Sequence, residues 1–140
     1  MSKFSWGRSS KVRLSGVHKI LRLFADRLID RVSIDITIPY RGGRRTAETQ
    51  YDIFVNGNGA TQRDGYTKKS YHQSGKALDI VAAGKTVEQM YDIDSLEHIM
   101  EVAEVVWCEM KEEGVTEGYT LELGGHWSWK DRPHYQIVKR

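Results

Sequence analysis

The sequence predicts an α+β fold in which helices pack against a small, mainly antiparallel β-sheet. Two long stretches of the 140 residues repeat apolar side chains at helical spacing, and several short runs alternate apolar with polar residues. These patterns do not follow one another in a regular βαβ rhythm, which argues against a parallel sheet. The length suits one ordinary hydrophobic core, so we expect a single domain over residues 1–140, with no separate second module.

In the first half of the chain, the pattern predicts a helix, a strand, a shorter helix and a loop. Apolar residues at intervals of three and four indicate a helix over residues 15–30. Residues 32–38 alternate valine or isoleucine with polar residues, which predicts a half-buried strand. Thr46 suits the N-cap of a short helix over residues 46–56. Residues 57–69 contain almost nothing to bury and are expected to form a long loop.

In the second half, the pattern predicts strands on either side of a long amphipathic helix. Residues 77–82 form an apolar run that suits a buried strand, and residues 119–123 alternate as a further strand. A fourth strand is expected over residues 134–138. The helix covers residues 95–113 and ends at Gly114. Its predicted buried face consists of Leu96, Ile99, Met100, Ala103, Val106, Trp107 and Met110.

The composition excludes several classes of protein. A net charge of +2 and scattered basic residues do not indicate a nucleic-acid-binding surface. No apolar run is long enough for a membrane span, and the N-terminal residues lack the apolar segment of a secretory signal peptide. The single cysteine, Cys108, excludes an internal disulfide and is consistent with a reducing cytoplasm. Its place in a helical pattern predicts a small, buried apolar side chain.

Two histidines and an aspartate, far apart in the chain, suggest a metal site. His72 and Asp79 lie seven residues apart, and His134 follows near the C-terminus. Two imidazoles and a carboxylate are a sufficient ligand set for a catalytic zinc ion, which uses three protein ligands. Gly75 lies between the first two and permits the turn that would bring both to one metal. Asp131, three residues before His134, is positioned to carry the proton of a hydrolytic water.

Simpler interpretations exist for each pair of residues. His72 and Asp79 taken alone also suit a surface histidine and a helix-capping aspartate. Asp131 also suits a surface carboxylate that pairs with Arg132 or Lys130. The spacing of Asp131 and His134 fits one side of a helical turn, but the proline before His134 favours a bent entry into a strand.

Four motifs in this order resemble the zinc peptidase family of D-alanyl-D-alanine carboxypeptidases, dipeptidases and phage L-alanyl-D-glutamate endopeptidases. The family pattern is Ser-x-His, Gly, a small residue and Asp, followed at a distance by an acidic residue, two spacers and His. The matching residues are Ser70, His72, Gly75, Ala77, Asp79, Asp131 and His134. The phage subgroup adds an opening motif at residues 9–18, an arginine motif at residues 43–50 and a closing motif at residues 123–136. One departure is His126, where the subgroup usually has aspartate.

The resemblance implies roles for the matching residues. His72, Asp79 and His134 would bind Zn²⁺, and Asp131 would act as the catalytic acid and base. Arg45 would bind a substrate carboxylate or stabilise the developing oxyanion, and is preferred to Arg44 because the family arginine directly precedes the threonine. The fold implied is that of the zinc D,D-peptidases.

Four further residues have more than one possible role at this point. Ser70 either contacts the substrate or holds the loop that carries His72. Trp127 either walls the substrate groove or packs in the core, and the same holds for Trp129. His126 is interpreted as a non-ligand, because a hydrolytic zinc ion needs an open position.

The motifs together predict a zinc-dependent peptidoglycan hydrolase that cleaves the L-alanyl–D-glutamate bond of the stem peptide during phage-induced lysis. The alternatives are a D-alanyl-D-alanine carboxypeptidase or dipeptidase, which has the same metal set, and a non-catalytic zinc-containing module that binds the wall. The expected partner is the stem peptide, with neither nucleic acid nor membrane, and we expect a monomer. The expected location is the host cytoplasm before release to the cell wall.

Overall fold

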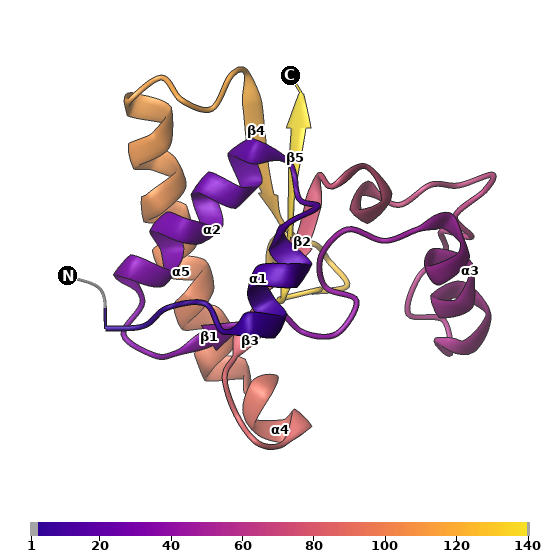
Figure 1. Ribbon diagram of the computed structural model, residues 1–140. Coiled ribbons are helices and arrows are strands. Elements are labelled where there is room, and N and C mark those ends of the chain that lie inside the picture. The colour runs from indigo at the N-terminus through magenta and orange to yellow at the C-terminus, as the bar shows by residue number, and fades with distance from the viewer. Residues whose placement is uncertain (1–2, 140) are drawn as a thin grey trace.

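The computed structural model describes residues 3–139 and confirms the α+β class, with short antiparallel strands packed against helices (Figure 1). The helices are α1 (Arg8–Leu14), α2 (Lys19–Arg31), α3 (Ala47–Asn56), α4 (Val87–Met90) and α5 (Ile93–Glu112). The strands are β1 (Ile36–Thr37), β2 (Ala77–Asp79), β3 (Val81–Ala82), β4 (Tyr119–Leu123) and β5 (His134–Lys139). Two short 3-10 turns complete the fold, η1 (Tyr71–Ser74) and η2 (Gly124–His126).

The core lies between the two long helices and the three-stranded sheet. Phe24 of α2 packs against Trp107 of α5 and Tyr135 of β5, with ring centroids 6.1 and 5.8 Å apart. All seven residues of the predicted apolar face of α5 are buried, as expected for an amphipathic helix over a core. Figure 1 shows α2 and α5 crossing on one side of the sheet, while α3 projects on the other side of the molecule.

The helix ends follow ordinary capping chemistry. The Thr46 side chain accepts a hydrogen bond from the Thr49 N–H and caps α3, as predicted. Asp92 caps α5 in the same way, so this helix begins two residues earlier than the apolar pattern indicates. The His18 ring caps α2, which places the start of this helix after residue 18 and not at residue 15. Gly114 follows α5 with a left-handed backbone, the usual helix stop.

The strands form two separate antiparallel sheets. The larger sheet has the order β2-β5-β4, and the smaller one pairs β1 with β3. In the larger sheet Asp79, the last residue of β2, lies directly opposite His134, the first residue of β5. Two residues that are 55 positions apart in the sequence thereby become cross-strand neighbours.

The prediction of one continuous strand over residues 77–82 was wrong, because the segment forms two strands, β2 and β3. The chain changes sheets at Ile80, whose N–H donates to the Pro133 carbonyl (2.9 Å). Residues before this point pair with β5, and residues after it pair with β1. Apart from Asp79 the run is apolar, because both strands face the core, so its composition carried no sign of the break.

The strand predicted over residues 32–38 is also shorter than expected. Its alternation correctly predicted which side chains turn inward, since Val32, Ile36 and Ile38 are buried. Only β1 pairs, because its partner β3 is two residues long. Burial with period two therefore does not require a continuous hydrogen-bonded strand.

Two short helices and one side chain departed from the sequence predictions. The prediction did not include α1 or α4; α1 has no side-chain N-cap and α4 buries no residue. Cys108 is exposed and not buried, because it follows the inward-facing Trp107 and so lies beside the apolar face of α5. Residues 57–69 contain neither helix nor strand, as predicted. Within residues 3–139, no helix has the length and apolar character needed to cross a membrane.

Candidate metal centre

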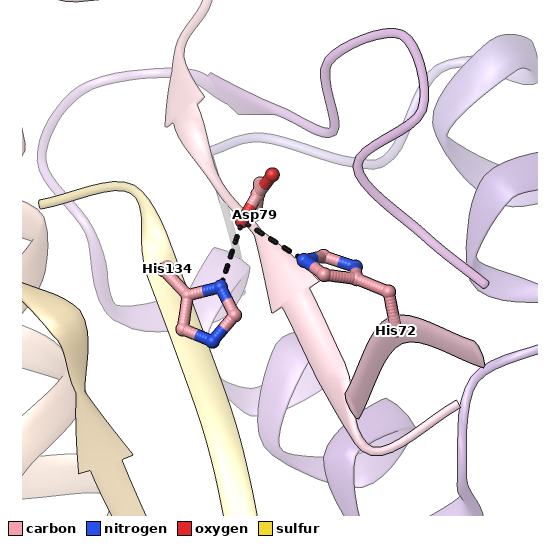
Figure 2. A group of neighbouring side chains, drawn as sticks. All are labelled: His72, Asp79 and His134. Carbon is pink, nitrogen blue, oxygen red and sulfur yellow. Dashed lines mark ion pairs between the residues drawn. The ribbon is translucent and has the colours of Figure 1, made fainter. Parts of the chain in front are cut away.

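Three side chains from three elements converge at one end of the larger sheet (Figure 2). His72 comes from η1, Asp79 ends β2 and His134 begins β5. The Asp79 Oδ1 atom lies 3.4 Å from Nε2 of His72 and 3.3 Å from Nδ1 of His134. One potential ligand atom from each residue lies within 4.8 Å of the other two, a spacing that a single metal ion can bridge.

The turn η1 holds His72 in this position through a capping box. The Ser70 hydroxyl accepts a hydrogen bond from the His72 N–H (3.2 Å), and the Gln73 side chain accepts one from the Ser70 N–H (2.8 Å). Gly75 ends the turn with φ +74°, and a Cβ there would lie 2.6 Å from the Gly16 carbonyl oxygen. Of the two roles considered for Ser70, these bonds match holding the loop.

The hydrogen bonds of the His72 ring determine which nitrogen faces the cluster. Its Nδ1 atom lies 2.9 Å from the Gly43 carbonyl oxygen, which can only accept, so Nδ1 carries the hydrogen. The Nε2 atom of the neutral ring is then an acceptor directed at Asp79. The His72 side chain is 2% exposed, so water cannot easily reorient it.

The His134 ring is oriented in the opposite sense by a chain of two hydrogen bonds. Glu122 accepts a hydrogen bond from the Gln136 amide nitrogen (2.7 Å), which turns the Gln136 oxygen toward His134. That oxygen lies 2.7 Å from Nε2 of His134, so Nε2 donates and Nδ1 faces Asp79. Such acceptors behind a histidine are typical of metal ligands, because they fix its tautomer and its orientation.

These two orientations fit a cation between the rings and Asp79. Each neutral imidazole directs a lone pair toward the same carboxylate, an arrangement that is repulsive without a positive charge at the centre. When the two rings are protonated, they supply this charge themselves: burial alone would raise the pKa of Asp79, but its charge interactions and hydrogen bonds with the protonated histidines hold that pKa well below the usual range. Burial lowers the pKa of His134, but in its protonated form the ring donates from Nδ1 to Asp79, which outweighs the effect of burial and raises that pKa.

Arg45 lies on the other side of the Asp79 carboxylate. Its Nη2 atom is 3.3 Å from Oδ2, the oxygen that does not contact the histidines. Its other donors bind the Arg41 carbonyl (2.8 Å) and the side-chain oxygen of Gln50 (3.0 Å). Desolvation is the main effect on the Arg45 pKa and lowers it, with Asp79 opposing. Arg44 is exposed and donates to the Gln73 carbonyl, so Arg45 is the arginine at this site.

Asp131 lies in the turn that precedes β5. Its N–H donates to the Gly124 carbonyl (2.9 Å), and its own carbonyl accepts from the His134 N–H (3.1 Å). A side chain at Gly124 would collide with the Asp131 carbonyl, so this glycine permits the close approach of the turn. Although the Asp131 residue is exposed, desolvation of its carboxyl and the neighbouring Asp79 charge raise the pKa of that carboxyl against the effect of His134. The segment enters a strand from a bend, as Pro133 indicated.

Known proteins resemble this chain in sequence and in fold. The sequence matches the phage L-alanyl-D-glutamate peptidase family over residues 1–139. The chain belongs to this family. The structure resembles that of the L-Ala D-Glu endopeptidase ChiX of Serratia marcescens, with a TM-score of 0.73 and 24% identity over 97% of this chain and 92% of that one. This similarity establishes the shared fold. No curated protein matches the chain.

Membership in the family confirms that the chain is a peptidase acting on peptidoglycan, as the sequence predicts. Trp127 lies against the cluster of His72, Asp79 and His134, with its ring centroid 5.3 Å from that of His134. His126 is 57% exposed, pairs with Glu104 (2.8 Å) and is not part of the ligand cluster found among residues 3–139.

Two residues at the site of this phage peptidase carried no role in the sequence interpretation. Gln50 is completely buried, accepts from Arg45 and donates to the Arg63 carbonyl (2.9 Å), so it connects the arginine to the 57–69 loop. Gln136 orients His134. Gln50 lies in the arginine motif, and Gln136 lies two residues after His134 in the predicted strand. A glutamine at a buried position or in a strand beside such motifs could have indicated both roles.

Proposed function

We propose that this chain is a zinc-dependent endopeptidase that hydrolyses the L-alanyl–D-glutamate bond of the peptidoglycan stem peptide. The observation that carries the proposal is the convergence of His72 Nε2, His134 Nδ1 and Asp79 Oδ1, with the other ring nitrogens engaged by acceptors. Two imidazoles and a carboxylate are a known ligand set for catalytic zinc, which leaves a position open for water. Family membership supports the choice of bond.

The bound metal would supply Lewis acidity, which polarises the substrate carbonyl and makes water a nucleophile at neutral pH. Asp131 would accept the proton of the attacking water at a carboxylate oxygen and transfer it to the departing amine nitrogen of D-glutamate. Its backbone bonds to Gly124 and His134 keep it next to the ligands without making it one. The proton balance closes, because the proton taken from water is returned to the leaving group.

Arg45 would act by fixed positive charge. Its contacts with Arg41 and Gln50 hold the guanidinium in place, and two of its five N–H groups remain after the three bonds that the side chain makes. D-Glutamate in the stem peptide carries an α-carboxyl group next to the bond to be cut. A planar guanidinium that is already oriented suits recognition of this carboxylate.

All residues of the proposed machinery come from one chain, which supports a monomer as the working unit and one catalytic domain over residues 1–140. Membership in a phage family supports a role as an endolysin. We propose that it acts on the wall from the host cytoplasm after a separate protein permeabilises the membrane.

The bond can be identified from the products of digestion of purified peptidoglycan. Mass spectrometry should detect stem peptides with a new N-terminus on D-glutamate and glycan fragments that end in L-alanine. Release of D-alanine or of D-alanyl-D-alanine would instead assign the chain to the carboxypeptidases or dipeptidases. Binding to the wall without any product would favour a non-catalytic module.

Gln136→Leu should weaken zinc binding without changing the ligands. The leucine removes the acceptor behind His134, and such outer contacts typically contribute about 10- to 100-fold to metal affinity. Competition with a chromophoric chelator measures this affinity. Gln89→Leu is a matched control, because Gln89 also accepts a hydrogen bond, from the Lys85 N–H, but lies on α4. Equal zinc affinity of the Gln136 variant and the parent would contradict the orienting role.

A further inference from the structure

Two tryptophans form a continuous aromatic surface that leads from the metal cluster to solvent. The ring centroid of Trp127 lies 5.3 Å from that of His134, and the ring centroid of Trp129 lies 5.1 Å from that of Trp127. Trp129 is 72% exposed, although a tryptophan side chain normally gains much stability from burial. The inner ring therefore touches a ligand, and the outer ring presents its surface to water.

The backbone holds this surface in place. The Lys130 N–H donates to the Trp127 carbonyl (3.0 Å), and the Lys130 side chain donates to the Gly125 carbonyl (3.3 Å). Lys130 has φ +42°, a left-handed conformation that residues other than glycine seldom adopt. Strained positions of this kind persist where the surrounding structure enforces them, often beside functional sites. The exposed ring thus belongs to an ordered turn.

The substrate would bring a sugar ring close to the proposed metal site. This step rests on the proposed function: cleavage between L-alanine and D-glutamate leaves one alanine and a lactyl group between the reacting carbonyl and the ring of N-acetylmuramic acid. One extended residue spans roughly 3.5 Å. The lactyl group adds a similar length, so the sugar lies only a short way from the reacting carbonyl. Arg45, which suits the substrate carboxylate, contacts Asp79. Trp127, which belongs to the aromatic surface suited to the sugar, contacts His134. The two groups therefore lie beside different ligands.

We propose that Trp129, supported by Trp127, binds the glycan portion of peptidoglycan by packing against the face of a sugar ring. The C–H groups on one face of a pyranose are apolar and slightly positive, and they complement the negative face of an indole ring. A flat exposed aromatic surface accepts such a ring without a deep pocket. The chain then recognises both the stem peptide and the strand to which the peptide is attached.

Two substrates with the same scissile bond test this proposal. One is a disaccharide-tetrapeptide from peptidoglycan, and the other is the same tetrapeptide, N-acetylated and without sugar. Trp129→Ala should raise KM for the disaccharide substrate roughly 3- to 10-fold, the effect of one aromatic contact, and leave kcat unchanged. Kinetics on the sugar-free peptide should not change. Trp129→Phe should restore part of the loss.

Tyr40→Ala is the matched control, because Tyr40 is 74% exposed and packs against arginine side chains. It should leave both substrates unaffected. An equal effect of Trp129→Ala on both substrates would overturn the proposal in favour of a peptide contact or a general structural role. Unchanged kinetics on both would overturn it as well.

A binding measurement separates this proposal from the proposed function. Peptide-free glycan oligosaccharides are titrated against the parent and the Trp129→Ala variant while protein NMR shifts are followed. Saturable binding to the parent that the variant loses supports the proposal, even if the protein cleaves neither peptide substrate and the proposed function fails. Identical or absent shifts in both proteins would overturn it.

Discussion

His134→Ala should abolish both zinc binding and hydrolysis. The substitution removes one of three ligand atoms that lie within 4.8 Å of one another, and a remaining histidine and carboxylate are too few for a stable zinc site. His72→Ala should have the same effect. It also leaves the buried Gly43 carbonyl without its partner, so it should cost stability in addition, and His134→Ala is therefore the cleaner variant.

Metal analysis by mass spectrometry and a wall-lysis assay on the same preparations check this expectation. His126→Ala is the matched control, because this histidine is exposed, pairs with Glu104 and lies outside the ligand cluster. It should keep one zinc ion per chain and most of the activity. If His126→Ala lost zinc as completely as His134→Ala, the assignment of ligands would be wrong.

Asp131→Asn should lower hydrolysis by about 10²- to 10⁴-fold, the usual contribution of general acid–base catalysis. Asparagine retains the size and polarity of the side chain but cannot take up the proton of the attacking water. The backbone contacts of residue 131 with Gly124 and His134 do not involve its carboxyl, so the turn should persist. Zinc content and melting temperature should therefore stay close to those of the parent.

The three quantities need to be measured side by side, because only their combination separates catalysis from metal binding. Asp30→Asn makes the same chemical change at an exposed position near the end of α2 and should alter none of them. Loss of zinc in Asp131→Asn would make Asp131 a ligand. Lysis at the parental rate would remove Asp131 from the mechanism.

Much of the architecture could be predicted because it follows from local patterns. The buried face of α5 and the Thr46 cap of α3 depend on residues within one helix, and both predictions were confirmed. The break at Ile80 could not be predicted. The two halves of the run pair with different strands, β5 and β1, and this choice of partner is made by the tertiary structure. Cys108 is exposed because it lies one residue further around the helix than the buried Trp107. An approximate apolar pattern does not resolve a difference of one residue.

The candidate site shows a similar division. The spacing of His72, Asp79 and His134 and the family resemblance indicated the ligands, and the structure brings all three together. The hydrogen bonds that orient the rings were beyond prediction, because they depend on the Gly43 carbonyl and on the cross-strand position of Gln136. Side-chain identity suggests which atoms can bind a metal, whereas their orientation arises only from the folded chain.

Reconstitution with zinc tests the central claim most directly. The protein is stripped with a chelator, titrated with zinc and assayed at each step for stem peptides that begin with D-glutamate. Cleavage should be absent from the stripped protein and should rise in proportion to added zinc until one equivalent per chain is bound, while His134→Ala remains inactive throughout. Undiminished release of the same product by protein shown to contain no metal would contradict the account.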